Sequence, residues 1–435
     1  MSELLERIGG RDETGLPGWA ADLRRDGRER FRAYGLPHKR LEDWKYTPLV
    51  GLEKRLDAPT AAKDARPGLD IDGAPRLDFA GGRLGALPGD LPPGLHEGCT
   101  VLPLADALAL DAGPWRGLAE ALDTEGPSRA MAALNNASLG QGVAIHVADG
   151  VDAGALVLRW QDGASGAAAA DVAARDDAAL DSALLDNARV LLVLGEGARL
   201  DLVEHANLGG ALNLVMQARL GPGSRLRHAR LQDDGADSWL ITRTAVEQAA
   251  DSRFEQASLD LGTGLARHDL VARLAEPGAV CIAHGAYLPT GSAHVDHHLD
   301  MRHEAVGCCS EQTFRGVLHD RGRAVFNGRV HVLPGADDSE AHQSNQNLLL
   351  SRDAEVDTKP ELIIEADEVV ASHGATVGQL DETALFYLRS RGIPDRQARQ
   401  MLTGAFCRSV VEAIGNEAAR AAFGERLEAA LERGS

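Results

Sequence analysis

Residues 190–203, Val-Leu-Leu-Val-Leu-Gly-Glu-Gly-Ala-Arg-Leu-Asp-Leu-Val, contain two short apolar runs separated by a glycine-rich turn. Apolar runs of this length, bounded by Gly, Pro, Asp or Asn, predict β-strands. Similar runs occur at 155–158 and 362–364, so we expect strands throughout the middle of the chain. The composition, with 48 Gly but only 5 Trp, 4 Tyr and 8 Phe, also favours many short strands and tight turns over a bulky helical core.

A loose repeat accompanies these runs. A small residue, preceded by Gly, Asp or Arg and followed within two positions by an apolar residue, recurs at Ala198, Ser224, Ser252, Ala279, Ala324 and Ala354. The spacings are 26, 28, 27, 45 and 30 residues. Periods of about 20–50 residues are typical of solenoids, and strand-sized units at this spacing predict the coils of a β-helix. A β-sandwich with similar turn spacing is the alternative.

Three regions are expected along the chain. The first, 1–95, is an N-terminal helical region, in which Pro17 opens a helix and regular structure is not predicted after about residue 51. The second, 96–370, is the β-helix core. The third, 371–435, is a C-terminal helical region.

The C-terminal region is predicted to contain three amphipathic helices. Asp381 and Asn416 can cap the first and the third, and Pro394 can open the second. Such helices usually pack on their own domain, and docking a partner is the alternative. The residues expected on one face of the second helix are Ala398, Met401, Leu402, Ala405 and Ile414.

Composition excludes several classes of function. The 435 residues carry a net charge of -20, which argues against a nucleic-acid partner because such binding depends on clustered Lys and Arg. The 5 cysteines are an odd number without regular spacing, unlike a secreted disulfide framework. Neither a signal-peptide pattern nor 18 consecutive apolar residues occurs, so we expect a cytoplasmic protein. The sequence lacks a P-loop, so we do not expect this chain to bind a nucleotide through that motif.

Histidine is concentrated in one stretch, since 8 of the 15 histidines lie between His284 and His342. Imidazoles bind several transition metals, so a metal store is one interpretation. However, neighbouring residues of a strand point to opposite faces, which prevents His297 and His298 from reaching one metal ion. The same argument separates Cys308 from Cys309. Histidines on a solvated strand face are the alternative.

Five segments and two short N-terminal motifs occur in an order that is typical of one protein family. This series resembles the Suf iron–sulfur cluster assembly scaffold family, which includes paralogous SufB and SufD branches. Gly35-Leu36-Pro37 and Glu42–Thr47 are similar to the SufD branch in particular. The other segments are Arg323–Gly328, Gln343–Ser351, Glu355–Leu362, Ser372–Gly378 and Leu385–Ile393.

The resemblance implies a mainly β protein, with a right-handed parallel β-helix core and helical N- and C-terminal regions. It implies a non-catalytic scaffold subunit that pairs with a SufB-type paralogue and docks a SufC-type ABC ATPase through the C-terminal helices. A homodimer of the isolated chain is a further expectation. The isolated chain is expected to hold no stable cofactor, and an iron–sulfur cluster would be transient at the SufB-type interface. The residues expected to bind partners are Leu385, Phe386, Tyr387, Arg389, Arg391, Met401 and Phe406.

The resemblance also assigns a site residue. His373 matches the family histidine implicated in building the nascent cluster, and we expect it to hold iron or that cluster. A neutral imidazole is a weaker and more proton-sensitive ligand than a thiolate, which suits a scaffold that must release its product. Ala371 stands where the SufD branch commonly has Cys. Cys308 is a second candidate ligand, with a buried structural thiol as the alternative.

A carbohydrate-active β-helix enzyme is the competing function. Such an enzyme needs paired carboxylates on one face, which Asp296 and Asp300 could supply. The scarcity of aromatic residues argues against it, because sugar sites usually contain aromatic platforms.

Overall fold

The computed structural model describes residues 16–52, 68–85, 97–110, 113–161, 185–233, 235, 238–262 and 264–433. The helices are α2 (Gly18–Tyr34), η1 (Glu42–Trp44), α4 (Leu104–Ala109), α5 (Trp115–Glu120), η2 (Pro127–Arg129), α6 (Ala130–Ala137), α8 (Glu382–Ser390), α9 (Asp395–Glu412) and α10 (Glu417–Arg433). The strands are β1 (Arg76–Ala80), β2 (Arg83–Leu84), β3 (Cys99–Pro103), β4 (Gly142–Val147), β5 (Asp152–Gln161), β6 (Leu185–Leu194), β7 (Arg199–Asn207), β8 (Ala211–Leu220), β9 (Arg225–Gln232), β10 (Trp239–Gln248), β11 (Arg253–Asp260), β12 (Leu265–Leu274), β13 (Val280–Tyr287), β14 (His294–His303), β15 (Cys309–Leu318), β16 (Arg323–Val332), β17 (Ser339–Leu349), β18 (Glu355–Ile364) and β19 (Val369–Gly378).

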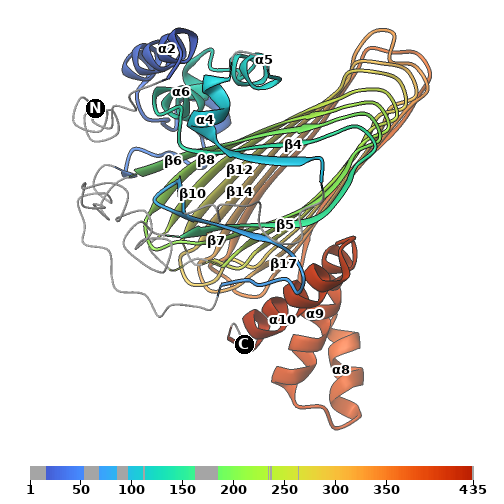
Figure 1. The fold of residues 1–435 in the computed structure, drawn as a ribbon. Helices are drawn as coiled ribbons and strands as arrows, with labels where there is room; N and C mark the ends of the chain where they lie inside the picture. The colour runs from blue at the N-terminus through green and yellow to red at the C-terminus, as the bar shows by residue number, and fades with distance from the viewer. Residues whose placement is uncertain are drawn as a thin grey trace.

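The strands form the coils of a parallel β-helix (Figure 1). From β4 to β19, successive strands alternate between a 9-stranded and a 10-stranded sheet. Each of these strands pairs with the strand two positions along the chain, and all of these pairings are parallel. The β-helix prediction is therefore confirmed. The β-sandwich alternative is wrong, because its neighbouring strands would run antiparallel.

The small residues of the sequence repeat occupy one corner of successive coils. Ala198, Ser224, Ser252 and Ala279 each precede the first residue of a strand in the 10-stranded sheet, and these strands pair with one another in the same register. All four residues are buried. The residue before each one has a φ between 56° and 74°, in the left-handed region that Gly and Asp tolerate best. The repeat therefore specifies a tight turn and then a side chain small enough for the inside of the corner.

The 45-residue break in the repeat is caused by a change of sheet. Ala324 and Ala354 lie at the starts of β16 and β18, in the 9-stranded sheet. In the 10-stranded sheet the series continues without a break through Cys308 and Ser339, which occupy the same corner in the next two coils. Both are buried like the earlier members.

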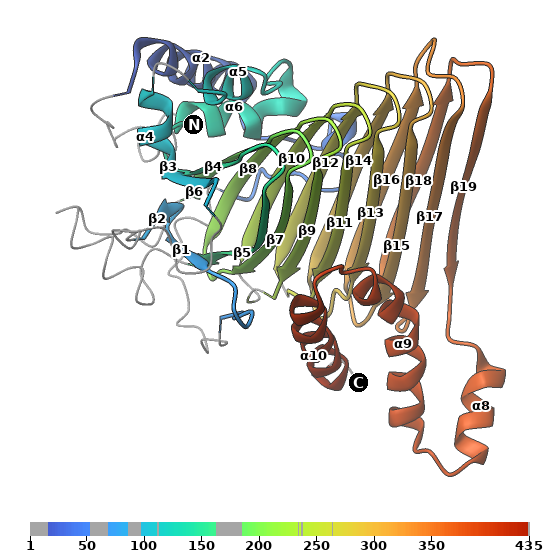
Figure 2. The ribbon, with the colours of Figure 1, turned by 45° about the vertical axis from the view of Figure 1, so that its right-hand side comes forward.

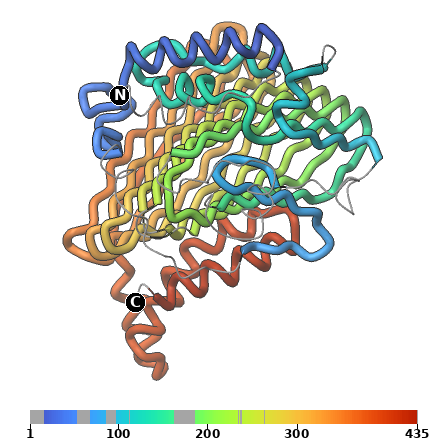
Figure 3. The backbone as a smooth tube through the Cα atoms, turned by 60° about the vertical axis from the view of Figure 1, so that its left-hand side comes forward, coloured from blue at the N-terminus to red at the C-terminus, as the bar shows by residue number. Residues whose placement is uncertain are grey.

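Helices cover the outer face of each sheet (Figures 1 and 3). The N-terminal helices lie against the 9-stranded sheet, where Phe31 and Leu134 pack with Ala211. Helices α9 and α10 lie against the 10-stranded sheet, where Val410 and Phe423 belong to the same buried cluster as strand residues. Helix α8 contacts α9 and projects from the rod (Figure 2). The last coils of the rod extend beyond the N-terminal helices.

Three details differ from the sequence prediction. The region after residue 51, expected to lack regular structure, contains β1 and β2, and β1 extends the 10-stranded sheet by pairing with β5. The expected β core, 96–370, also contains helices α4, α5 and α6 before the regular coils begin. The expected boundary at 371 falls inside β19, because the last coil continues to Gly378.

A polar network lies inside the β-helix beside the apolar core. The carboxylate of Asp260 accepts hydrogen bonds from the Nε2 atoms of His268 and His297, at 2.9 and 3.0 Å. Nδ1 of His268 lies 2.8 Å from Oγ1 of Thr242, which accepts a bond from Arg230. All five residues are buried. Burial alone would raise the pKa of the Asp260 carboxyl, but the two imidazoles outweigh it and hold that pKa below its usual range. The network thus joins the two sheets across the interior.

Two of the buried histidines predict sensitivity to acid. Burial lowers the pKa of His268 and of His303 to about 4, from about 6.5 for an exposed imidazole. Between these values the unfolded chain binds protons that the folded chain does not. The free energy of unfolding should therefore fall as the pH falls through this window, by up to about 3 kcal/mol per histidine.

Urea unfolding measured at a series of pH values tests this fall in the free energy of unfolding, here called the acid limb. His303→Gln should flatten it, because the neutral amide has no proton to gain. His319→Gln, at a surface histidine that lies 3.0 Å from Asp320, is the matched control and should leave the limb unchanged. An identical acid limb in the His303 variant and the wild type would contradict the explanation.

Candidate functional site

The rod ends in an open coil formed by β18 and β19. These strands are the last members of their sheets, and within the described residues each pairs with one neighbour, β16 for β18 and β17 for β19. Figure 2 shows β19 at the far end of the row of strands. The outer edges of β18 and β19 therefore present backbone N–H and C=O groups that no other described strand pairs with. Such an edge is a template for pairing with another chain.

His373 lies on the inward face of this open coil. It pairs in register with Gln343 of β17, which is buried in the interior. Side chains in register on neighbouring strands point to the same face of the sheet. The imidazole of His373 is nevertheless exposed. The structure thus places this histidine at the end of the rod, above the interior.

The other inward-facing residues of this coil are mostly apolar. Ala371 lies on the same face, two residues from His373, so a cysteine at position 371 would approach the imidazole. Of the inward residues of β18 and β19, His373 is the single ionisable one. The inward residues are Val356, Thr358, Pro360, Leu362, Ile364, Val369, Ala371, His373, Ala375 and Val377.

The last two strands expose four apolar residues, here called the apolar rim, which the sequence analysis missed. Ile363, Ile364, Val370 and Val377 are 41, 45, 61 and 50 % exposed. Contiguous exposed apolar residues mark interaction sites on soluble proteins. The available signal was the presence of short apolar runs, at 362–364 and 369–370, in the last two strand-like segments of the sequence.

Cys308 and His373 are not brought together. Cys308 occupies the corner of an inner coil, where its Sγ lies 3.5 Å from the carbonyl oxygen of Glu276. The register aligns Cys308 with Val369, four residues before His373, which is about 13 Å along a strand. Burial raises the pKa of the Cys308 thiol, whereas a metal ligand must be a thiolate. The geometry therefore favours the buried structural thiol.

Replacing Cys308 by serine should leave cluster formation intact. The equivalent corner residues of other coils include Ser224, Ser252 and Ser339, so a hydroxyl fits this position. We expect a loss of about 0.5–3 kcal/mol in the free energy of unfolding, which is the range of most single substitutions. Urea unfolding and cluster formation in the assembled complex check this. A loss of cluster formation as large as that of a His373 variant would restore Cys308 as a ligand.

The histidines of the 284–342 stretch have separate partners. His297 points inward to Asp260, and His298 lies 3.0 Å from the carboxylate of Asp296 on the outer face, so the predicted separation of the two is confirmed. The expectation of a solvated strand face is wrong for His297 and His303, which are buried in the polar interior. Among the described residues, no group of three or more His, Cys, Asp or Glu is placed to hold a metal ion.

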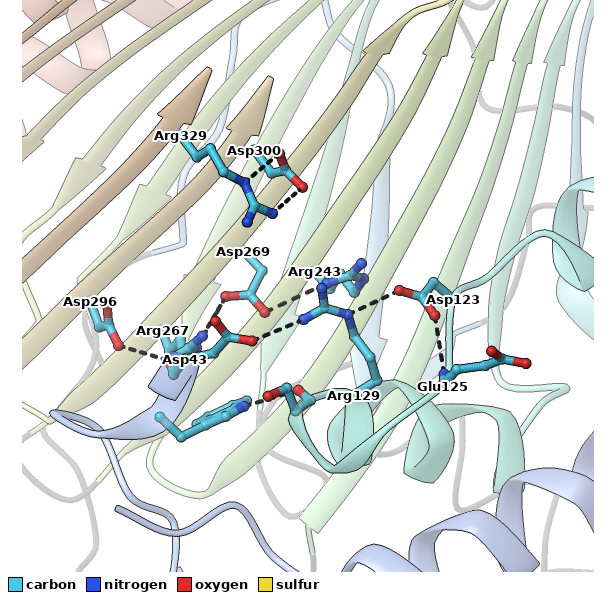
Figure 4. A network of polar contacts seen from close by, with 12 residues as sticks. Asp43, Asp123, Glu125, Arg129, Arg243, Arg267, Asp269, Asp296, Asp300 and Arg329 are labelled. Carbon is cyan, nitrogen blue, oxygen red and sulfur yellow. Dashed lines mark hydrogen bonds and ion pairs between the residues drawn. The ribbon is translucent and has the colours of Figure 1, made fainter. Parts of the chain in front are cut away.

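Asp296 and Asp300 do not form a catalytic pair. Both lie in a network of ion pairs on the outer face of the 9-stranded sheet (Figure 4). An oxygen of Asp296 lies 2.9 Å from Arg267, and one of Asp300 lies 2.8 Å from Arg329. Burial opposes ionisation of both carboxyls, but neighbouring cationic side chains hold their pKa values below the usual range. A glycosidase general acid needs a raised pKa, so this geometry argues against sugar cleavage.

The N-terminal segment Glu42–Thr47 is fixed to the same outer face. The guanidinium of Arg267 lies 3.8 Å from the ring centre of Trp44, and its Nη1 donates a hydrogen bond to the carbonyl oxygen of Asp43 at 2.6 Å. Thr47 donates a hydrogen bond to Asp296. The ring and hydroxyl contacts explain physically why the segment has its aromatic residue Trp44 and its hydroxyl residue Thr47.

Most of the residues expected to bind partners are exposed on the C-terminal helices. Phe386, Tyr387 and Met401 are 72, 56 and 46 % exposed, and the guanidinium of Arg391 lies 5.2 Å from the ring centre of Tyr387. Arg389 is also exposed. Helix α8 thus presents two large rings beside two cations.

Two other expected residues need correction. Leu385 is 1 % exposed, so it stabilises the helical region and is not available to a partner. Phe406 is half-buried and packs against the buried apolar residues between α9 and the 10-stranded sheet. The Arg315 guanidinium lies 5.5 Å from its ring centre. The predicted apolar face of α9 is also wrong in part, because Met401 and Ala405 are exposed. The buried residues of α9 are Ala398, Thr403, Gly404, Cys407, Val410 and Val411.

The fold and its open end define a parallel β-helix protein whose last coil is suited to contact another chain. Comparison with known sequences gives the family. Residues 178–406, more than half of the chain, match the family described as "SUF system FeS cluster assembly, SufBD core domain". The chain belongs to this SufBD family of iron–sulfur cluster assembly proteins.

Individual relatives agree with this assignment. The chain is 33% identical over 244 residues to "Iron-sulfur cluster assembly protein SufD" of Escherichia coli, covering 54% of this chain and 58% of the relative. It is 36% identical over 202 residues to a SufBD family protein of Synechocystis, covering 46% and 45%. It is 31% identical over 240 residues to "Protein ABCI7, chloroplastic" of Arabidopsis thaliana, covering 54% and 50%. The matches thus span about half the length of these relatives, and they support a SufD-type subunit. No helix in the described ranges is both long and apolar enough to cross a membrane.

Proposed function

We propose that this chain is a scaffold subunit of a Suf complex, without turnover of its own, that pairs with a SufB-type paralogue through β18 and β19. The observation that supports this most is the open coil, which combines two unpaired strand edges, an apolar rim and one exposed imidazole. A paralogue with the same core would end in a similar coil. Two such ends could cover each other and bury both rims.

In the proposed complex, His373 supplies one ring nitrogen to iron or to the nascent cluster between the two subunits. The cluster is the cargo of the complex and is transient there, so the isolated chain holds no stable cofactor. Thiolates would come from the SufB-type partner, because Ala371 provides none. Covering the coil would surround the imidazole with apolar side chains, which disfavours a buried charge and so favours the neutral ligand form.

We also propose that a SufC-type ABC ATPase docks on the C-terminal helices. Helix α8 projects from the rod and exposes Phe386 and Tyr387 beside Arg389 and Arg391. Aromatic residues and arginine are the types enriched where protein interfaces bind most strongly. The complex would work in the cytoplasm, where the ATPase can hydrolyse ATP.

Copurification with the two partners tests the proposed surfaces separately. The double variant Ile364→Lys/Val377→Lys should abolish capture of the SufB-type subunit, because charges on an edge strand block pairing. Capture of the ATPase should persist. The control Val306→Lys changes an apolar residue that is 42 % exposed elsewhere on the rod, and it should capture both partners.

The converse variant, Phe386→Ala/Tyr387→Ala, should lose the ATPase and keep the SufB-type subunit. The same surfaces predict the behaviour of the isolated chain, which should form a homodimer through the open coil and become monomeric in the lysine double variant. Normal capture of the SufB-type subunit by the lysine double variant would exclude the open coil as the pairing surface.

A further inference from the structure

A short ladder of glutamine side chains lies directly beneath His373. Gln343 pairs in register with His373, and Gln312 pairs with Gln343 one coil deeper. Both glutamines are buried in the interior, with 4 and 0 % exposure. Nε2 of Gln343 donates a hydrogen bond of 2.8 Å to Oε1 of Gln312. The amide of Gln343 is therefore held from below by its nitrogen.

This arrangement leaves the other end of the Gln343 amide free. Its Oε1 is buried, and no hydrogen bond from the described part of the chain reaches it. A buried acceptor without a partner costs about 1–3 kcal/mol, so native proteins retain few of them. The free acceptor lies on the strand next to His373 and on the same face.

His373 can satisfy this acceptor. Neighbouring strands lie about 4.8 Å apart, so a glutamine and a histidine in register are within reach of each other. A neutral imidazole has one N–H donor and one acceptor nitrogen. The ring is exposed, and exposed side chains change rotamer on a picosecond to nanosecond timescale, so the imidazole can turn toward the amide without a barrier from packing.

The opposite sheet provides the space for Gln343. A Cβ atom added to Gly328 would lie 2.1 Å from Nε2 of Gln343 and 2.9 Å from the ring of Phe326. Any larger residue at 328 would displace the amide. The glycine of the Arg323–Gly328 segment and the glutamine that begins the Gln343–Ser351 segment thus form one unit beneath the open coil.

We propose that Gln343 is a positioning residue for His373: its Oε1 accepts the hydrogen bond of one ring N–H, which fixes the tautomer and directs the other ring nitrogen toward the space that the partner covers. This inference rests on the proposed function, in which that nitrogen holds iron. Metal-binding histidines almost always donate their other N–H to an oxygen acceptor in this way.

The tautomer of His373 tests the hydrogen bond without any cluster. In the isolated full chain labelled with ¹⁵N-histidine, at about pH 8 where a free imidazole is neutral, the His373 signals are those absent from His373→Ala. We expect one tautomer in the wild type and a mixture in Gln343→Met, which keeps the volume but removes the acceptor. Gln343→Glu keeps an acceptor and should keep the single tautomer. Gln346→Met, on the outward face of the same strand, is the control and should resemble the wild type.

A tautomer mixture in the wild-type chain would overturn the proposal, and this result needs no variant to fold. An unchanged single tautomer in a folded Gln343→Met chain would overturn it as well. Cluster formation by the assembled complex gives a second readout, in which Gln343→Met should reduce the yield about tenfold and Gln346→Met should not. Full cluster yield with Gln343→Met would contradict the positioning role. Full yield with His373→Ala would instead refute the proposed function, whatever the tautomer result.

Discussion

A complex that contains His373→Ala is expected to assemble with its partners in normal amounts but to form at least about tenfold less iron–sulfur cluster than the wild type. The reason is geometric. His373 is the single ionisable residue among the inward-facing side chains of the open coil, and no neighbouring thiol or carboxylate on that face can replace it. The alanine removes the proposed ligand but leaves the strand edges and the apolar rim intact. Copurification measures assembly, and visible absorbance with iron and sulfide content measures the cluster.

His342→Ala is the matched control for this prediction. His342 lies on the neighbouring strand but points outward, where its Nδ1 is 2.8 Å from the hydroxyl of Ser372. Its loss removes an imidazole from almost the same place in the structure, since His342 pairs with Ser372, and should leave the cluster yield unchanged. Equal yields from the two alanine variants would remove His373 from the mechanism.

The largest effect on stability is expected for Asp260→Ala. The carboxylate accepts hydrogen bonds from His268 and His297, and it is fully buried between the two sheets. Its removal leaves two buried imidazole N–H groups without an acceptor and creates a cavity. Breaking a buried, hydrogen-bonded charge network from one side costs about 3–5 kcal/mol. That is a large part of the roughly 5–15 kcal/mol that stabilises a typical domain.

Urea unfolding followed by circular dichroism measures this cost. Glu368→Ala, at an exposed carboxylate between β18 and β19, should change the free energy of unfolding by less than about 0.5 kcal/mol. A cost for Asp260→Ala as small as that of the control would mean that the interior network contributes little. The β-helix would then depend on its apolar core alone.

Most of the fold could be predicted from the sequence, because the corner of each coil has a local cause. A residue with positive φ followed by a small buried residue leaves a visible repeat, as at Ser224 and Ala279. The repeat also misled in one place, since Ala324 belongs to the other sheet and Cys308 was the true next member. A one-dimensional pattern cannot distinguish two sheets whose corners carry similar residues.

The site could be predicted in part. Alternation along a strand separates His297 from His298, but it does not say which of the two lies inside. Polar residues usually lie outside, and here the interior holds a carboxylate that makes a buried imidazole acceptable. The residues beneath His373 could not be predicted for another reason. Gln343 and Gly328 come from different sheets, and only the stacking of coils brings them beneath the open end.

The C-terminal helices show a third limit. Leu385 and Phe386 are neighbours with similar hydropathy, yet one is 1 % and the other 72 % exposed. The difference depends on how α8 packs against α9, which the helical period alone does not determine.

Amide hydrogen exchange of the open coil tests the central claim most directly. In the isolated chain, diluted until the expected homodimer dissociates, the backbone amides of residues 355–364 and 369–378 should exchange faster than those of the inner coils, because no further coil of the described chain covers these strands. Adding the SufB-type subunit should slow exchange strongly in these two segments and leave the far end of the rod unchanged. If the two proteins form a stable complex while exchange in both segments stays as fast as in the free chain, the open coil is not the surface at which they meet.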